Sequence, residues 1–151
     1  MIIISHRGNL DGPLEGNENT VPYIEKALHD FDVEIDVWYH KKKLWLGHDF
    51  PQDPIEVKWL LQNKKKLWIH CKNLDAMDYL CELNFTHPMG FNFFGHSSDD
   101  FVLTSQNYIF TLPFAGLTSR SVLVMPEFFD YDGSTAKAAA VLTDFPKRYI
   151  S

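Results

Sequence analysis

Cysteine is scarce in this chain, and no long apolar run is present. Two cysteines, Cys71 and Cys81, are too few for a disulfide scaffold and predict a reducing, cytoplasmic setting. No apolar run approaches the about 20 residues that a membrane-spanning helix needs. The first residues also lack the basic start and the long apolar stretch of a signal peptide. The sequence therefore predicts a cytoplasmic protein without a membrane span.

Basic residues are also in the minority. Lys and Arg number 14 against 20 Asp and Glu, which gives a net charge of -6. Binding to nucleic acid without sequence preference needs a basic surface, so no nucleic-acid partner is expected. Hydrophobic residues make up 45% of the chain and charged residues 23%. This balance, with the length, predicts one globular domain over residues 1–151.

The first half of the chain alternates apolar runs with amphipathic segments. One helix is expected after Thr20, a second from Asp53 and Pro54, and a third after the cap residue Asn73. In the third helix, Leu74, Met77, Leu80 and Cys81 share one face. Strands are expected at 2–5, 33–38, 44–46 and 67–71. This alternation is typical of a parallel sheet with right-handed crossovers.

The second half contains strand-like segments with few helices between them. They lie near 93–94, 101–103, 108–112, 122–124 and 141–142. The gaps between the first three are shorter than the about 10–12 residues of a parallel crossover, so 104–107 is interpreted as a hairpin turn. The resulting prediction is an α/β, TIM-barrel-like fold: a shrunken or incomplete (β/α)8 barrel that has lost helices in its second half. An open edge of such a barrel could be covered by a second copy, as a homodimer.

Polar side chains gather where the predicted strands end. Glu34 and Asp36 are two apart on a strand and point to the same side, where two carboxylates repel each other unless a cation or proton lies between them. A hard divalent metal would compensate them, because Mg2+ and Ca2+ prefer oxygen ligands. A strand with one solvated face is the alternative. His70 and Lys72 repeat the spacing, and His6 with Arg7 follows the first strand.

Four short motifs together resemble the glycerophosphodiester phosphodiesterase family. They are His6-Arg7-Gly8, Asn17-Glu18-Asn19-Thr20, Glu34-Ile35-Asp36-Val37 and Gly47-His48-Asp49, in the family's order. Residues 142–146, Leu-Thr-Asp-Phe-Pro, are similar to its last strand. The resemblance implies a TIM-barrel phosphodiesterase that hydrolyses small phosphodiesters with a divalent metal.

The resemblance also implies roles for individual residues. His6 and His48 would be the acid/base pair, and Arg7 and Lys72 would contact the phosphate. Metal ligands would be Glu34 and Asp36, with His70 at the family's third ligand position. The supporting residues would be Glu18, Asn19, His96 and Glu127.

One departure from the family pattern concerns the metal. The family has a Glu where this chain has His70. Imidazole favours Mn2+ or Zn2+ over the Mg2+ or Ca2+ that the resemblance implies, and Glu127 is the alternative source of a carboxylate. Two other functions stay open. One is a lyase that releases a cyclic phosphate, and the other is a catalytically weak or inactive protein that binds a phosphorylated ligand.

Overall fold

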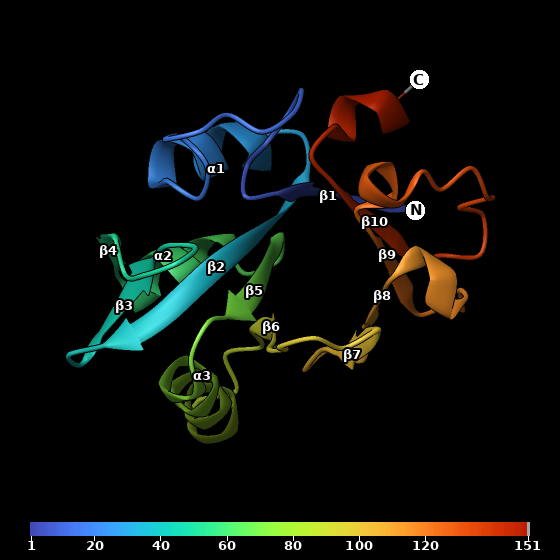
Figure 1. Cartoon of the computed structure of the whole chain (residues 1–151). Helices are drawn as coiled ribbons and strands as arrows, with labels where there is room; N and C mark the ends of the chain where they lie inside the picture. The colour runs from blue at the N-terminus through green and yellow to red at the C-terminus, as the bar shows by residue number, and fades with distance from the viewer. Residues whose placement is uncertain (151) are drawn as a thin grey trace.

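Ten strands form one mixed sheet in the computed structural model, which describes residues 1–150 (Figure 1). The sheet order is β4-β3-β2-β1-β10-β9-β8-β7, and β5 pairs with both β2 and β6. The strands are β1 (Ile2–His6), β2 (Asp32–His40), β3 (Lys43–Leu46), β4 (Asp53–Ile55), β5 (Leu67–Cys71), β6 (Asn92–Phe94), β7 (Phe101–Leu103), β8 (Ile109–Thr111), β9 (Ser121–Val124) and β10 (Ala140–Thr143). Seven of them, from β6 through β5, β2, β1, β10 and β9 to β8, run parallel.

The predicted (β/α)8 barrel is wrong. The sheet stays open because β6 pairs only with β5, while β7 pairs only with β8. The two edges approach each other through Ser105, whose backbone N–H donates to the Phe93 carbonyl at 2.9 Å. That contact comes from a turn and does not form a strand ladder. The hairpin predicted at 104–107 is confirmed, since β7 and β8 are antiparallel.

Few helices cover the sheet, which is the second difference from a (β/α)8 barrel. Residues 1–150 contain three α-helices: α1 (Val21–Leu28), α2 (Val57–Asn63) and α3 (Leu74–Thr86). In the second half, the connections 112–120 and 125–139 carry only the 3-10 turns Pro113–Ala115 and Pro126–Phe129. Without crossover helices, that part of the sheet has no outer helical layer of the kind that a (β/α)8 barrel requires.

Two predicted helix features are corrected by the structure. Residues 53–55 form β4, not the start of a helix, and α2 begins after Glu56. Asp-Pro is compatible with both choices, because proline is tolerated on an edge strand as well as in a first helical turn. Thr20 precedes α1, but its hydroxyl donates to the Asn17 carbonyl at 2.7 Å instead of capping the helix.

The third helix has the predicted cap residue, but the face that it packs against the core differs from the predicted one. Asn73 accepts a hydrogen bond from the Ala76 backbone N–H at 3.1 Å, which confirms it as the cap. Ala76 and Leu80 are the buried residues of α3, whereas Leu74 is 81% exposed and Cys81 is exposed too. Met77, Tyr79 and Leu83 pack partly buried beside them, so the face that contacts the core is centred on the small Ala76, and Leu74 points to solvent.

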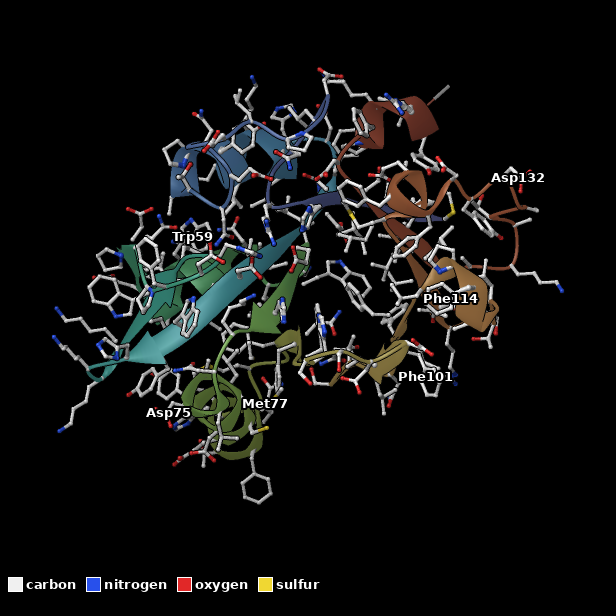
Figure 2. All side chains as sticks on the ribbon, in the orientation of Figure 1. Trp59, Asp75, Met77, Phe101, Phe114 and Asp132 are labelled. Carbon is white, nitrogen blue, oxygen red and sulfur yellow. The ribbon has the colours of Figure 1, made fainter. Side chains whose placement is uncertain are left out.

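Alternation along β2 separates the core from the site. Val33, Ile35 and Val37 are fully buried in one cluster that packs against the helices. Glu34 and Asp36 point to the opposite face, as the period of two in a strand predicts. A second apolar cluster contains Phe94, Phe110, Val122 and Leu142 from the other half of the sheet. Figure 2 shows side chains from both halves filling the space between the ribbons.

Candidate functional site

The register of three neighbouring parallel strands gathers the three predicted metal ligands and His6, one of the predicted acid/base residues. In the pairing of β1 with β2, His6 lies opposite Glu34. In the pairing of β2 with β5, Asp36 lies opposite His70. Residues paired across parallel strands on the same face have neighbouring side chains. The structure therefore brings together four residues from three strands, as their positions at strand ends suggested.

Asp36 is the electrostatic centre of this group. Its Oδ2 lies 2.8 Å from Arg7 Nε, and its Oδ1 lies 2.9 Å from His70 Nδ1 and 3.7 Å from Lys72 Nζ. Burial alone would raise the pKa of the Asp36 carboxyl, but the His70 contact and the Arg7 charge outweigh it and hold that pKa below its usual range. Asp36 is therefore a carboxylate at neutral pH.

Backbone hydrogen bonds and backbone conformation hold Asp36 and Arg7 in position. Asn19 accepts from the Asp36 backbone N–H at 3.0 Å and donates to its carbonyl at 2.9 Å, which fixes the strand beside the site. Arg7 has a left-handed φ of 52°, so the chain turns back after β1 and its guanidinium reaches Asp36. At Gly8, φ is +86°, and an added Cβ would lie 2.9 Å from Tyr23. This glycine is thus required by both the turn and the close approach of α1.

Glu34 is buried and incompletely neutralised. Its Oε1 lies 3.7 Å from His70 Nδ1, and its Oε2 lies 4.0 Å from His6 Nε2. Among residues 1–150, no hydrogen-bond donor reaches Oε2, although that atom is buried. Burial and then the neighbouring Asp36 charge raise the pKa of the Glu34 carboxyl. Such an oxygen favours a cation, because buried anionic groups are stable only when paired.

His6 is held by a carboxylate from the other end of the chain. Its Nδ1 lies 2.8 Å from Asp144 Oδ1, directly after β10. Asn9 donates to the same Asp144 oxygen at 2.7 Å and to Glu18 Oε1 at 2.6 Å. Burial lowers the pKa of His6, but the Asp144 hydrogen bond and the Glu34 charge outweigh it, so the net pKa is raised. An ionised Asp144 only accepts, so Nδ1 carries the hydrogen and Nε2 is left for chemistry.

Glu127 holds the residues that follow β10, including Asp144, in place. Its Oε1 accepts from the Thr143 hydroxyl at 2.9 Å and from the Asp144 backbone N–H at 2.7 Å. It does not line the pocket, and it belongs to neither group that could hold a metal ion within residues 1–150. The alternative in which Glu127 supplies the missing metal carboxylate therefore receives no geometric support. Its position instead fixes the turn that presents Asp144.

The second predicted acid/base residue comes from the loop after β3. His48 is partly exposed, lines the pocket, and has Nδ1 2.9 Å from Asp49 Oδ1. Gly47, before it, accepts the Trp38 indole N–H at 2.7 Å through its carbonyl. An added Cβ at Gly47 would collide with the Phe50 carbonyl oxygen, so only glycine allows this loop to fold beside the site.

His96 stacks against the other wall of the group. Its ring lies 4.6 Å from the His70 ring, with the planes 9° apart. His70 also stacks on Phe94 at 5.0 Å. Burial and then the His70 and Lys72 charges lower the pKa of His96, which favours its neutral imidazole. His96 thus contacts the site as predicted, through a ring stack.

A pocket of about 230 Å3 connects these residues. It is lined by His6, Arg7, Glu34, His48, His70, Lys72 and His96 among others. Both predicted acid/base histidines, both predicted phosphate-binding side chains and two of the predicted metal ligands therefore face one cavity. Asp36 lies behind these residues and contacts three of them, Arg7, His70 and Lys72.

Two groups of side chains could hold a metal ion within residues 1–150. The first is Glu34, Asp36 and His70, and the second is His6, Glu18 and Asp144. In the first, the neighbouring donor atoms are 2.9 Å and 3.7 Å apart. Adjacent ligands around an ion with bonds of about 2.1–2.4 Å are separated by about 3.0–3.4 Å. The two separations lie on either side of that range, so a divalent ion would fit once it replaces the hydrogen between His70 Nδ1 and Asp36, and the Glu34 oxygen without a donor offers a further ligand atom.

The second group is already occupied by hydrogen bonds. The Asn9 amide lies between Glu18 and Asp144 and donates to both. A metal ion there would have to displace it. This group is better described as support for His6.

Sequence reasoning missed Asp144 and Asn9. Asn9 is fully buried and Asp144 is 1% exposed, yet nothing local marks either as part of a site. The available signal was the position of Asp144 directly after a predicted strand, where the site residues of the other strands also lie.

In comparisons with known proteins, no family model, no curated protein and no solved structure matches this chain. No helix within residues 1–150 combines the length and the apolar character that crossing a bilayer would demand. The side chains of the pocket are therefore the basis for assigning a function.

Proposed function

We propose that this protein hydrolyses a small phosphodiester with the help of a divalent metal ion held by Glu34, Asp36 and His70. One observation carries the proposal: Glu34, a buried carboxylate with an oxygen that no donor reaches, faces a pocket that also contains the cations Arg7 and Lys72 and the histidines His6 and His48. The second buried carboxylate, Asp36, lies directly behind this pocket, 2.8 Å from Arg7. A metal ion explains the carboxylates, and a phosphate explains the cations.

The cations are placed to bind the nonbridging oxygens of the phosphate. Arg7 is anchored through Nε to Asp36, which leaves the terminal guanidinium nitrogens for a ligand. Lys72, two residues beyond His70, lines the same pocket. A divalent ion bound beside them would further offset the charge of the phosphate oxygens. Together these groups stabilise the charge that develops when the diester is attacked.

The histidines are placed to move protons. Each has Nδ1 against a carboxylate, Asp144 for His6 and Asp49 for His48, so Nε2 is the free ring nitrogen in both. One removes a proton from the attacking water as its oxygen bonds to phosphorus. The other donates a proton to the alkoxide as the ester P–O bond breaks. The products are a phosphomonoester and an alcohol.

The donor set also bears on the identity of the metal. Two carboxylates and one imidazole suit Mn2+ or Zn2+ better than Ca2+, because nitrogen ligands favour transition metals. We therefore propose Mn2+ or Zn2+ as the preferred ion. Mg2+ would be expected to bind more weakly.

A protein that binds phosphate without turnover is the second candidate, and one observation favours it. Arg7, His70 and Lys72 already lie around Asp36, so part of the negative charge is offset by the chain itself. Such a site can be stable without a metal ion. In that case Arg7 and Lys72 would hold a phosphorylated ligand while the histidines stay idle.

Turnover of methyl p-nitrophenyl phosphate separates the two candidates. Metal-free protein is assayed with Mn2+, Zn2+, Mg2+ and Ca2+ in turn, alongside Glu34→Gln and the control Asp75→Asn. Asp75 lies on α3, outside the sheet, and is exposed (Figure 2). Hydrolysis that depends on the ion and is lost in Glu34→Gln supports the enzyme. No turnover with any ion refutes it and favours the binding protein.

A further inference from the structure

The pocket has two chemically different walls. The polar wall comes from β1, β2, β5 and the loop after β3. The other wall is apolar and is built by Phe94, Phe110, Val124, Met125 and Leu142, and the exposed loop between β6 and β7 adds Asp99 and Asp100 to the lining. The five apolar residues lie on or directly after β6, β8, β9 and β10. Nothing in the proposed hydrolysis uses this second wall.

The apolar wall is packed ring against ring and begins at the proposed metal ligand His70. Phe94 stacks on the His70 ring at 5.0 Å with the planes 5° apart, and on Phe110 at 4.1 Å. Met125 has a left-handed φ of 45° and donates its backbone N–H to the Leu142 carbonyl at 2.8 Å. A non-glycine residue in that conformation is held there by its surroundings, and such residues cluster at binding sites.

The size of the pocket limits what can lie between the walls. Its volume of about 230 Å3 is below the about 300–1,000 Å3 of sites for drug-sized ligands. A phosphate group with one short substituent fits that space. A dinucleotide or an enclosed acyl chain would exceed it.

We propose that the substrate is a phosphodiester with a short alkyl or aryl ester group, which lies on the apolar wall formed by Phe94, Phe110, Val124, Met125 and Leu142. This rests on the proposed function, because Arg7 and Lys72 place the phosphate at the polar wall. An ester group that lies on these five side chains then meets only carbon and sulfur atoms, while Asp99 and Asp100 line the pocket from the exposed loop between β6 and β7. A glycerol group on those five side chains would lose the water bound to its hydroxyls and gain no hydrogen-bond partner from them, whereas an alkyl group gains by leaving water.

Binding of phosphonates, which are not hydrolysed, tests this independently of turnover. The full chain with Mn2+ is titrated calorimetrically with methyl-, propyl-, butyl- and 2,3-dihydroxypropylphosphonate. Each added methylene buried on the wall should raise the affinity about fourfold. The dihydroxypropyl compound should bind more weakly than propylphosphonate. Equal affinity along the series, or tighter binding of the dihydroxy compound, overturns the inference.

A near-isosteric variant localises the effect. Val124→Thr puts a hydroxyl on the wall without changing its shape, and Val57→Thr on α2, outside this pocket, is its matched control. The ratio of butyl- to methylphosphonate affinity should fall in Val124→Thr and stay unchanged in Val57→Thr. An unchanged ratio in both variants refutes the assigned wall.

The two proposals fail in different ways. Alkyl-dependent binding without hydrolysis of any phosphodiester refutes the enzyme but supports the ligand class. Hydrolysis without any alkyl preference refutes the ligand class alone. No binding of any phosphonate, together with no turnover, refutes both.

Discussion

His6 Nδ1 lies 2.8 Å from Asp144 Oδ1, although 138 positions separate the two residues. Their strands are neighbours, and the parallel register pairs Ser5 with Thr143 directly before them. The pairing of β1 with β10 thus joins the two ends of the described chain at the site. The orientation of His6 therefore depends on the pairing of β1 with β10, because its carboxylate partner directly follows the last strand.

Asp144→Asn should therefore impair catalysis without removing the ligand site. An amide cannot stabilise the imidazolium of His6 as a carboxylate does, and its NH2 group can force the other ring tautomer. The expected result is a fall in kcat of about 10²–10⁴-fold with little change in KM. Asp75→Asn serves as the exposed control. Nitrogen NMR of His6 should show the tautomer change, and an unchanged kcat would show that Asp144 is not a positioning residue.

His48→Ala should remove turnover at little cost in stability. The His48 side chain is 46% exposed and contacts a neighbouring residue of its own loop, so it contributes little packing. As a general acid or base it should contribute about 10²–10⁴-fold to kcat. His29→Ala is a suitable control, because His29 is an exposed histidine beyond α1. Thermal unfolding and steady-state rates measure the two effects. A mutant with wild-type kcat on a verified substrate rules out the role.

The local part of this site could be predicted from the sequence. Glu34 and Asp36 share a face because side chains alternate in every strand, whatever the rest of the fold does. The hairpin at 104–107 followed from the short spacing of its two strands. Both rules act over a few residues, so they do not depend on tertiary contacts.

The global part could not be predicted in the same way. Whether the sheet closes depends on pairing between β6 and β7. In the structure these two strands do not pair, and the backbone hydrogen bond between Ser105, a turn residue, and Phe93 joins the two edges instead. No local sequence pattern predicts this. Asp144 was missed for a related reason, since its role exists only through the pairing of β1 with β10. The Asp53-Pro54 pair suits both an edge strand and a helix start, so only packing decides between them.

The two cysteines should differ sharply in reactivity. Cys71 is 6% exposed on β5, and burial raises the pKa of its thiol to about 12, whereas Cys81 is exposed on α3. Thiolate is the reactive form, and at pH 8 a thiol of that pKa is ionised to only about one part in ten thousand. Iodoacetamide should modify one cysteine in native protein, none in Cys81→Ser, and both in guanidinium-unfolded wild type. Rapid labelling of Cys71 in the native state would contradict its burial.

His70→Glu should change the metal preference of the site. Carboxylate oxygen suits hard ions and imidazole nitrogen suits transition metals, so the variant should gain affinity for Mg2+ or Ca2+ relative to Mn2+ or Zn2+. It also adds a third carboxylate beside Glu34 and Asp36 and removes the imidazole that lies 2.9 Å from Asp36. Without metal the variant should be less stable by about 1–3 kcal/mol, the range for a buried group that loses its partner.

Calorimetric titration of both proteins with each ion, and thermal unfolding with and without metal, test this change. His29→Glu adds the same charge at an exposed position and controls for net charge. Added metal should restore the stability of His70→Glu, and it should stabilise His29→Glu only as much as it stabilises wild type, because His29→Glu keeps the proposed site. If the metal preference is identical in wild type and His70→Glu, His70 is not a ligand. Its contacts with Asp36 and Phe94 would then make it a positioning residue for the carboxylate and the apolar wall.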